Sequence, residues 1–316
     1  MDGDYGHKSV LLQECLDALQ IKPDGVYVDG TLGGGGHAEE ILKRLSPKGR
    51  LLGIDRDEDA LAAAKERLSA FPNLTLVRDN FRNLKEILKS LQMESVSGVV
   101  LDLGVSSYQF DTGERGFSYR FEDMPLDMRM DTRQALTAET IVNTYDEATL
   151  FLVLKRYGEE PFAKQIARSI VKEREKRPIR TTGQLNDLIR ASVPEKYGAR
   201  GAHPSKRAFQ ALRIEVNGEL DALKETLADA IPLLRDGGRL CVITFHSLED
   251  RLVKEAFASA EHPCTCPPGF PVCVCGKQPL GRTITKKGIT PSAEETASNR
   301  RARSAKLRVF ERRVSE

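Results

Sequence analysis

The chain has 316 residues, of which 40% are hydrophobic and 30% are charged. This length suits one large domain or two ordinary ones, and the composition is typical of a soluble globular protein. Residues 1–25 lack the apolar core of a signal peptide, and no apolar run approaches the length that spans a membrane. We therefore expect a cytoplasmic protein without a membrane partner.

The net charge of +2 conceals an uneven distribution along the chain. Residues 276–316 hold 11 lysines and arginines against 4 acids, whereas the rest of the chain has a small acidic surplus. A basic tail on a near-neutral body indicates a polyanionic partner such as a nucleic acid. A tail that only improves solubility is the alternative.

The first third of the chain alternates between predicted helices and strands. Apolar residues at helical spacing predict an amphipathic helix over 8–20, and short apolar runs after it predict strands. The predicted strands are 26–28, 51–54, 74–77 and 98–101, and the helices between them are 38–45, 58–68 and 84–91. This order predicts an α/β fold with a parallel sheet, helices on both faces and ligands at the carboxyl ends of the strands.

A glycine-rich turn over residues 30–36 follows the first strand. Glycines allow positive φ angles and let the backbone approach a ligand closely. Asp55 ends the next strand, where a carboxylate is suited to bind a ribose diol. Together these features predict a site for a cofactor that carries a nucleoside, with a turn that binds nothing as the alternative.

Asp29 and the spacing of the glycines constrain which cofactor this is. A dinucleotide-binding loop reads Gly-x-Gly-x-x-Gly, and residues 33–37 do not clearly keep that spacing. Asp29 stands directly before the turn, where it would repel a pyrophosphate. It would attract a cationic ligand such as S-adenosylmethionine, which carries a sulfonium and an ammonium group. A nicotinamide-dependent oxidoreductase is therefore disfavoured.

The remaining strands also end in residues suited to a ligand. Asp79 and Phe81 follow the third strand, placed to hydrogen-bond to an adenine and to pack against it. An aromatic residue at the position of Phe81 is equally typical of the core. The alternative role of Asp55 is to cap the next helix. Asp102 ends the fourth strand.

After Asp102 the alternation of strands and helices stops. Residues 103–135 are loop-like and rich in Gly, Arg, Asp and Met, which predicts an insertion before the sheet resumes. The later predicted elements are helices within 137–193, one or two helices over 204–234, a strand over 237–245, a helix capped by Ser247 with Asp250 reaching back, and a strand over 306–311.

Six cysteines are present, and two of them, Cys15 and Cys241, lie in apolar stretches typical of the core. The other four form Cys-x-Cys-x6-Cys-x-Cys in a Pro- and Gly-rich segment and are Cys264, Cys266, Cys273 and Cys275. Four thiolates suit a structural zinc ion, but Cys-x-Cys is tighter than the usual Cys-x2-Cys. Two states of these four cysteines therefore stay open, coordination of a structural zinc ion and four reduced thiols. A catalytic zinc is disfavoured because four thiolates leave no open position, and no metal is assigned to the active site.

Several short segments, in order along nearly the whole chain, resemble the bacterial small-subunit ribosomal RNA methyltransferase H family, also called RsmH or MraW. The matching segments are residues 7–12, 29–37, 53–57, 102–107, 115–118, 125–130, 203–204, 245–251 and 301–304. Each segment alone would be weak, but their combination is specific. The cysteine-rich segment is the main departure from the family pattern.

The resemblance implies transfer of a methyl group from S-adenosylmethionine to N4 of a cytidine in the decoding region of 16S rRNA, within the small ribosomal subunit. It implies a class I, Rossmann-like methyltransferase fold with a seven-stranded, mostly parallel sheet whose last strand is antiparallel. The methyltransferase domain would comprise 1–108 and 206–316, and 109–205 would form an inserted helical substrate-recognition domain. The implied cofactor-binding residues are Gly34, Gly35, Gly36, His37, Asp55, Phe81, Asp102 and Gln109.

Asp102 is also the candidate catalytic residue. Its carboxylate, or the carbonyls after it, would accept the N4 hydrogens and help the proton leave; a role in holding only the cofactor stays open. Ser106, Ser107 and His246 are second candidates for contacting the base, which must be splayed out of folded RNA. The candidate phosphate contacts are Arg115, Arg120, Arg129, Lys206, Arg207, Arg213, Arg300, Arg301, Arg303 and Lys306.

Other functions on the same fold stay open from the sequence. A methyltransferase acting on DNA or protein is one, and an RNA-binding factor that merely retains a cofactor site is another. The oligomeric state, monomer or homodimer, also stays open.

Overall fold

The computed structural model describes residues 9–106, 109, 113–121, 123–198, 203–267, 272 and 274–314. The chain divides into two compact units, which are described separately. Unit 1 comprises Met1–Gly104 and Leu220–Glu316, and unit 2 comprises Val105–Glu219. Unit 2 is therefore an insertion in the chain of unit 1.

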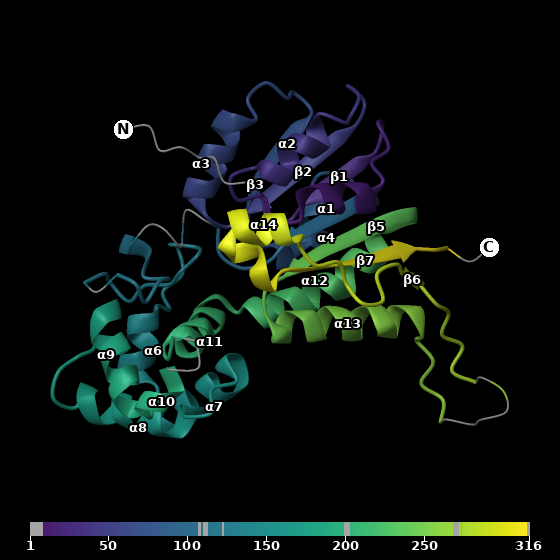
Figure 1. Cartoon of the computed structure of the whole chain (residues 1–316). Helices are drawn as coiled ribbons and strands as arrows, with labels where there is room; N and C mark the ends of the chain where they lie inside the picture. Colours follow the sequence, from purple (N-terminus) through teal and green to yellow (C-terminus); the bar gives the residue numbers. More distant parts are fainter. Residues whose placement is uncertain are drawn as a thin grey trace. The chain divides into compact units, whose positions relative to one another are not determined.

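Unit 1 is built on a seven-stranded sheet with the order β3-β2-β1-β4-β5-β7-β6 (Figure 1). Its strands are β1 (Val26–Asp29), β2 (Arg50–Asp55), β3 (Leu74–Arg78), β4 (Val96–Asp102), β5 (Leu234–Thr244), β6 (Gly281–Thr283) and β7 (Lys306–Arg312). The first five strands pair in parallel, and β7 pairs antiparallel with β5 and with β6. The predicted α/β fold with an antiparallel last strand is thus confirmed. The sequence did not reveal β6, because three residues are too few for an alternating pattern.

Both faces of the sheet are buried, since successive residues of its strands point to opposite faces. Val99 and Leu101 of β4 pack in one apolar cluster with helices α4, α12 and α13. Val100, between them in the chain, packs in a second cluster with α1, α2 and α3. These helices are α1 (Leu12–Leu19), α2 (Gly36–Leu42), α3 (Glu58–Arg67), α4 (Leu84–Ser90), α12 (Glu219–Leu233) and α13 (Ser247–Glu261). The result is the three-layer arrangement that parallel strands require.

Three short helical segments also belong to the described part of unit 1. The sequence after β3 forms η1 (Phe81–Asn83), and the sequence before β7 forms α14 (Ala293–Ser298) and η3 (Arg300–Ser304). The backbone N–H of Leu11 donates to Oε1 of Glu295 at 2.8 Å, which ties α14 to the start of α1. The C-terminal region is therefore folded into unit 1 and is not a free tail.

Unit 2 is helical in its described residues, as predicted for 137–193. Its elements are η2 (Gly113–Arg115), α6 (Ala138–Thr144), α7 (Glu147–Gly158), α8 (Ala163–Arg174), α9 (Thr182–Ser192), α10 (Glu195–Gly198) and α11 (Lys206–Asn217). Thr137 caps α6 as predicted, and Thr181 forms a capping box with Gln184 at the start of α9.

The end of unit 2 falls at Glu219, whereas the sequence placed it at residue 205. The difference arises from α11, whose Phe209 and Leu212 pack in the core of unit 2. A Cβ at Gly158 of α7 would lie 2.7 Å from the Arg207 carbonyl oxygen, so α7 and α11 cross at close range. The predicted segment 204–234 divides into α11 and α12 at Gly218, which has a φ of 58°.

No helix in the described ranges is long and apolar enough to cross a membrane.

Candidate functional site

The glycine-rich turn joins β1 to α2 in a conformation that depends on glycine. Gly33 and Gly35 have positive φ angles of 49° and 78°. A Cβ on Gly35 would also lie 3.0 Å from Cδ1 of Leu68, and one on Gly36 would lie 2.1 Å from Oγ of Ser9. Gly34 instead has open space where its Cβ would be. The turn is therefore close-packed on its inner side and leaves the backbone at Gly34 accessible to a ligand.

Asp55 lies at the carboxyl end of β2, directly against this turn. Its Oδ2 accepts a hydrogen bond from the Gly33 N–H at 2.8 Å, and its Oδ1 accepts one from the Asp57 N–H at 2.9 Å. The carboxylate is thus fixed in orientation. The N-cap of α3 is Asp57, which accepts from the Asp59 N–H, so capping by Asp55 is the wrong alternative.

Asp29 ends β1 and is buried, with 1% of its surface exposed. Burial, followed by the nearby Asp55 charge, raises the pKa of the Asp29 carboxyl to about 7, although the Thr31 N–H donates to its Oδ1 at 3.2 Å. Burial is also the main cause of a raised pKa at Asp55. The turn therefore lies between two desolvated carboxyl groups that favour a nearby positive charge.

Asp102 ends β4, the neighbour of β1 in the sheet. Its backbone N–H donates to Oγ1 of Thr31 at 2.6 Å, which ties the strand end to the glycine-rich turn. Burial raises the pKa of Asp102 well above its usual value, and the charges of Asp29 and Glu249 add to this. No lysine or arginine among the described residues forms an ion pair with Asp29 or Asp102.

His37, the second residue of α2, faces Asp102. Its Nδ1 lies 3.8 Å from Oδ2 of Asp102. Burial lowers the pKa of the imidazole to about 4, although a hydrogen bond to the backbone of Val10 opposes this shift. Nε2 of His37 and Oδ1 of Asp102 are buried, and the described part of the chain offers neither of them a hydrogen-bond partner. Buried polar atoms normally have partners, so both atoms point to a bound ligand that supplies them.

Phe81 and Asp79 follow β3 as expected, with different surroundings. Phe81 is half-buried and packs against the cluster that contains Leu101. Oδ1 of Asp79 accepts hydrogen bonds from the Asn80 N–H and from Nδ2 of Asn83, so it shapes the turn before α4. The predicted adenine contacts of both residues stay predictions.

The corner between β5 and α13 differs from its prediction. The N-cap is His246, not Ser247, and its Nδ1 accepts from the Glu249 N–H. Glu249 completes the capping box, where the sequence placed Asp250, because its Oε2 accepts from the N–H groups of His246 and Phe245. His246 therefore shapes this corner, and its predicted contact with a base stays a prediction.

Sequence reasoning missed Thr31 and Glu249 as parts of the site. Thr31 accepts from the Asp102 N–H, and the Glu249 charge contributes to the raised pKa of Asp102. The signal for Glu249 was present, since an acid three residues after a polar residue at a helix start is typical of a capping box. No local pattern indicates that Thr31 reaches the end of β4.

The other predicted contacts lie in unit 2 or outside the described residues. Gln109 is buried, and its Oε1 accepts from the Ser106 N–H at 3.0 Å, while Oγ of Ser106 accepts from the Gln109 N–H. This pair braces its own turn, and the cofactor contact predicted for Gln109 stays a prediction. Ser107 and Cys273 lie outside the described residues.

Several of the basic residues predicted to hold phosphates form contacts within their own unit, and their phosphate contacts stay predictions. Arg115 donates to the Arg129 carbonyl, Arg129 pairs with Asp127, and Arg213 pairs with Glu219. In unit 1, Arg308 pairs with Asp250 at 2.6 Å. The basic surplus of the C-terminal region is thus partly neutralised within the fold.

In unit 2, Arg120, Arg190 and His203 form an exposed basic group. The imidazole of His203 stacks on the ring of Tyr119 with centroids 4.2 Å apart. Burial is the first cause of its lowered pKa, and the charges of Arg190 and Arg120 lower that pKa further, so both guanidinium groups lie nearby. Both arginines are exposed.

The site in unit 1 fits a cationic nucleoside ligand. Carboxyl groups end three adjacent strands, and the backbone beside them is open at Gly34. Oδ1 of Asp102 has no hydrogen-bond partner among the residues that the structure describes. S-adenosylmethionine combines a ribose diol with two positive charges, which this set of groups matches. His37, which lies 3.8 Å from Asp102, is uncharged at pH 7 because its pKa is lowered to about 4, so it offers no positive charge to a pyrophosphate.

Comparison with known proteins agrees with this assignment. The model of the MraW methylase family matches residues 4–313. Ribosomal RNA small subunit methyltransferase H 2 of Agathobacter rectalis is 58% identical over 310 residues, covering 98% of this chain and 99% of that protein. Ribosomal RNA small subunit methyltransferase H of Lachnospira eligens is 56% identical over 310 residues, covering 98% of each chain. The chain therefore belongs to the MraW methylase family.

Proposed function

We propose that this protein transfers the methyl group of S-adenosylmethionine to N4 of a cytidine in the decoding region of 16S rRNA. The observation that carries the proposal is the row of Asp29, Asp55 and Asp102 at the ends of adjacent strands, with desolvated carboxyls and no lysine or arginine partner for Asp29 or Asp102 among the described residues. The relatives' names supply the substrate class, because they are ribosomal RNA small subunit methyltransferases.

The residues of unit 1 divide the binding of the cofactor between them. Asp55, held by the Gly33 and Asp57 N–H groups, accepts hydrogen bonds from the ribose hydroxyls. Gly34, Gly35 and Gly36 bring the backbone close, and Phe81 packs on the adenine. Asp29 and Asp102 favour the positive charge. When bound, S-adenosylmethionine supplies an electrophilic methyl group on a sulfonium.

Asp102 orients the acceptor amine in this proposal. The lone pair of cytosine N4 is delocalised into the ring, so the amine needs hydrogen-bond acceptors that favour positive charge on it as the new bond forms. Oδ1 of Asp102 has no partner among the described residues and is available to accept an N4 hydrogen. The raised pKa of this carboxyl makes it a better acceptor for the proton that N4 then loses.

The basic group of unit 2 is proposed as an RNA contact. Arg120 and Arg190 provide exposed charge for phosphates, and the Tyr119–His203 stack provides an aromatic surface for an unpaired base. Exposed Arg300 and Arg303 in η3 add charge in unit 1. These contacts give unit 2 the substrate-recognition role expected of the insertion.

The test uses purified full-length protein, methyl-labelled S-adenosylmethionine and small ribosomal subunits that lack the modification. Nucleosides are separated after digestion, and label in N4-methylcytidine is expected. Equal amounts of naked 16S rRNA, DNA and bulk protein serve as competing acceptors. Label that appears in DNA or protein, or in another nucleoside, would overturn the proposed target.

If the protein binds S-adenosylmethionine but no nucleoside is labelled, the result concerns catalysis and not cofactor binding. Calorimetric binding of S-adenosylmethionine without methyl transfer to subunits or rRNA would favour a non-catalytic RNA-binding factor.

A substrate in the ribosome places the enzyme in the cytoplasm in this proposal. A homodimer stays a prediction, which sedimentation equilibrium of the purified protein tests.

A further inference from the structure

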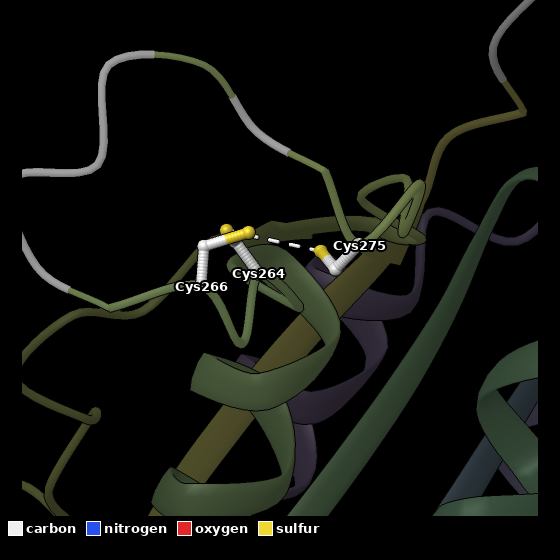
Figure 2. Close-up of side chains that lie close together, drawn as sticks. All are labelled: Cys264, Cys266 and Cys275. Atoms are coloured by element: carbon white, nitrogen blue, oxygen red, sulfur yellow. Dashed lines mark hydrogen bonds between the residues drawn. The ribbon is translucent and has the colours of Figure 1, made fainter.

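The segment between α13 and β6, residues 262–280, brings three cysteines together. Sγ atoms of Cys264, Cys266 and Cys275 all lie within 4.8 Å of one another. Figure 2 shows the three side chains with their sulfur atoms turned toward a common point. Two cysteines come from the start of the segment and one from its end, so the cluster joins chain positions that are distant in the segment.

The spacing of the sulfur atoms fits coordination of one metal ion. Sγ of Cys275 lies 3.9 Å from Sγ of Cys264. Two thiolates bound to the same zinc ion at about 2.3 Å, with a tetrahedral angle between them, stand about 3.8 Å apart. The pair is therefore at the separation that tetrahedral zinc requires, and the third sulfur, Sγ of Cys266, lies within 4.8 Å of both.

We propose that Cys264, Cys266 and Cys275 bind a structural zinc ion. Thiolates select zinc over magnesium or calcium, which prefer oxygen ligands. On binding, each thiol loses its proton to solvent, and its sulfur replaces one water on Zn²⁺. The proposal rests on these three residues; Cys273 completes the sequence pattern but lies outside the described residues. It does not depend on the proposed methyl transfer.

The surroundings of the cluster are suited to such a site. The Val274 N–H donates to Sγ of Cys266 at 3.4 Å, an outer hydrogen bond of the kind that stabilises a metal-bound thiolate. Cys264 is exposed and the other two cysteines are half-buried, so an ion can enter from solvent. No carboxylate or imidazole belongs to the cluster found in the described residues.

In the described residues of this segment, apolar packing contributes little. Val272 and Val274 are 70% and 73% exposed, so these apolar side chains form no core. At the base of the segment the Leu280 N–H donates to the Ala260 carbonyl at 2.8 Å, which closes the ends. Beyond that base, a metal cross-link between Cys264, Cys266 and Cys275 would hold the described residues of the segment together.

The first test measures zinc in the purified full-length protein. The protein is prepared with reducing agent and zinc and then freed of excess metal by gel filtration. We expect about one zinc per chain, falling below about 0.1 in Cys264→Ser and in Cys275→Ser. Cys15→Ala, which removes a buried thiol outside the segment, is the matched control and is expected to keep its zinc. Cys273→Ser, measured in parallel, tells whether that residue supplies a fourth ligand.

A second measurement keeps the result interpretable if a variant folds poorly. Cobalt added to reduced, zinc-free wild-type protein is expected to give the sulfur-to-metal charge-transfer and visible bands of tetrahedral thiolate coordination. Circular dichroism and S-adenosylmethionine binding of each variant verify that unit 1 is folded. Wild-type protein with no zinc and no cobalt spectrum would overturn the proposal, and so would mass-spectrometric detection of disulfides among these cysteines in protein purified under reducing conditions.

Discussion

Oδ2 of Asp102 lies 3.8 Å from Nδ1 of His37, and the two groups do not form an ordinary ion pair. Burial lowers the pKa of His37 to about 4, so the imidazole is neutral at pH 7. The distance exceeds that of a hydrogen bond, and each side chain keeps a buried atom without a partner in the described ranges. Because buried polar atoms normally have hydrogen-bond partners, we expect a bound ligand to form hydrogen bonds with these two atoms.

Substitution of Asp102 separates its two proposed roles. If Asp102 orients the amine of the acceptor, Asp102→Asn retains one acceptor oxygen and keeps more activity than Asp102→Ala. If it must also take the proton, both variants lose about 100-fold or more in kcat. In either case we expect the Kd for S-adenosylmethionine, measured by calorimetry, to change less than about tenfold. A Kd that rises as much as kcat/KM falls would show that Asp102 only holds the cofactor.

Replacement of Asp55 is expected to weaken cofactor binding without unfolding the protein. Asp55→Asn puts an NH2 group where one oxygen accepts a backbone N–H and would accept a ribose hydroxyl. Hydrogen bonds to a charged group contribute about 1.5–3 kcal/mol, so the Kd should rise about 10- to 100-fold. Glu66→Gln, an exposed acid on α3, is the control. Unchanged affinity in Asp55→Asn would remove Asp55 from the site.

The sequence predicted the sheet and the acids at its edge because both follow from local patterns. Short apolar runs alternating with helices require parallel strands, and the carboxyl ends of parallel strands lie at one edge. Asp29, Asp55 and Asp102 could therefore be placed together before the structure was known. A local pattern carries no information on residues that pair although they are distant in the chain. Examples are the hydrogen bond from the Asp102 N–H to Thr31 and the ion pair of Arg308 with Asp250.

That limit explains the predictions that failed. The C-terminal region was interpreted as a basic tail because charge is counted along the chain, whereas β7 pairs with β5 in the interior of the sheet and Arg308 is buried. The end of the insertion was misplaced because α11 and α12 are both amphipathic, and only packing of Phe209 against unit 2 shows where α11 belongs. Ser247 and His246 are adjacent polar residues, and the sequence does not show which of them caps α13. His246 has the extended backbone conformation of an N-cap, so its side chain caps the helix.

Protonation of Asp29 is expected to change stability and cofactor affinity in opposite directions. Its pKa is about 7 in the folded protein and about 3.9 in an unfolded chain. A raised pKa stabilises the folded state fully below pH ~4 and loses that stabilisation as pH rises through ~7. Asp29→Asn should therefore gain stability relative to wild type as pH rises from ~4 to ~7, whereas its affinity for the cationic cofactor should be about tenfold lower at pH 8.

Thermal unfolding and calorimetry between pH 5 and pH 9 check this prediction. His37 contributes with the opposite sign, because its pKa is lowered to about 4 and its stabilisation is lost as pH falls below ~6.5. The difference between Asp29→Asn and wild type cancels that contribution, since both proteins keep His37. A difference in unfolding temperature that is independent of pH would contradict a titrating Asp29.

Removal of Arg120 and Arg190 tests unit 2 as an RNA contact. Because phosphate contacts release counterions, the double variant Arg120→Ala/Arg190→Ala should bind small subunits more weakly, and its slope of log K against log salt should fall by about 2. Arg168→Ala, an exposed arginine on α8 whose side chain is 68% exposed, is the matched control and should keep the wild-type slope. Binding is measured by filter retention at several salt concentrations, with S-adenosylmethionine affinity as the measure of an intact unit 1. If the double variant and the control lose affinity equally, the basic group around His203 is an ordinary solvated surface, and the RNA contact must be sought at Arg300 and Arg303 instead.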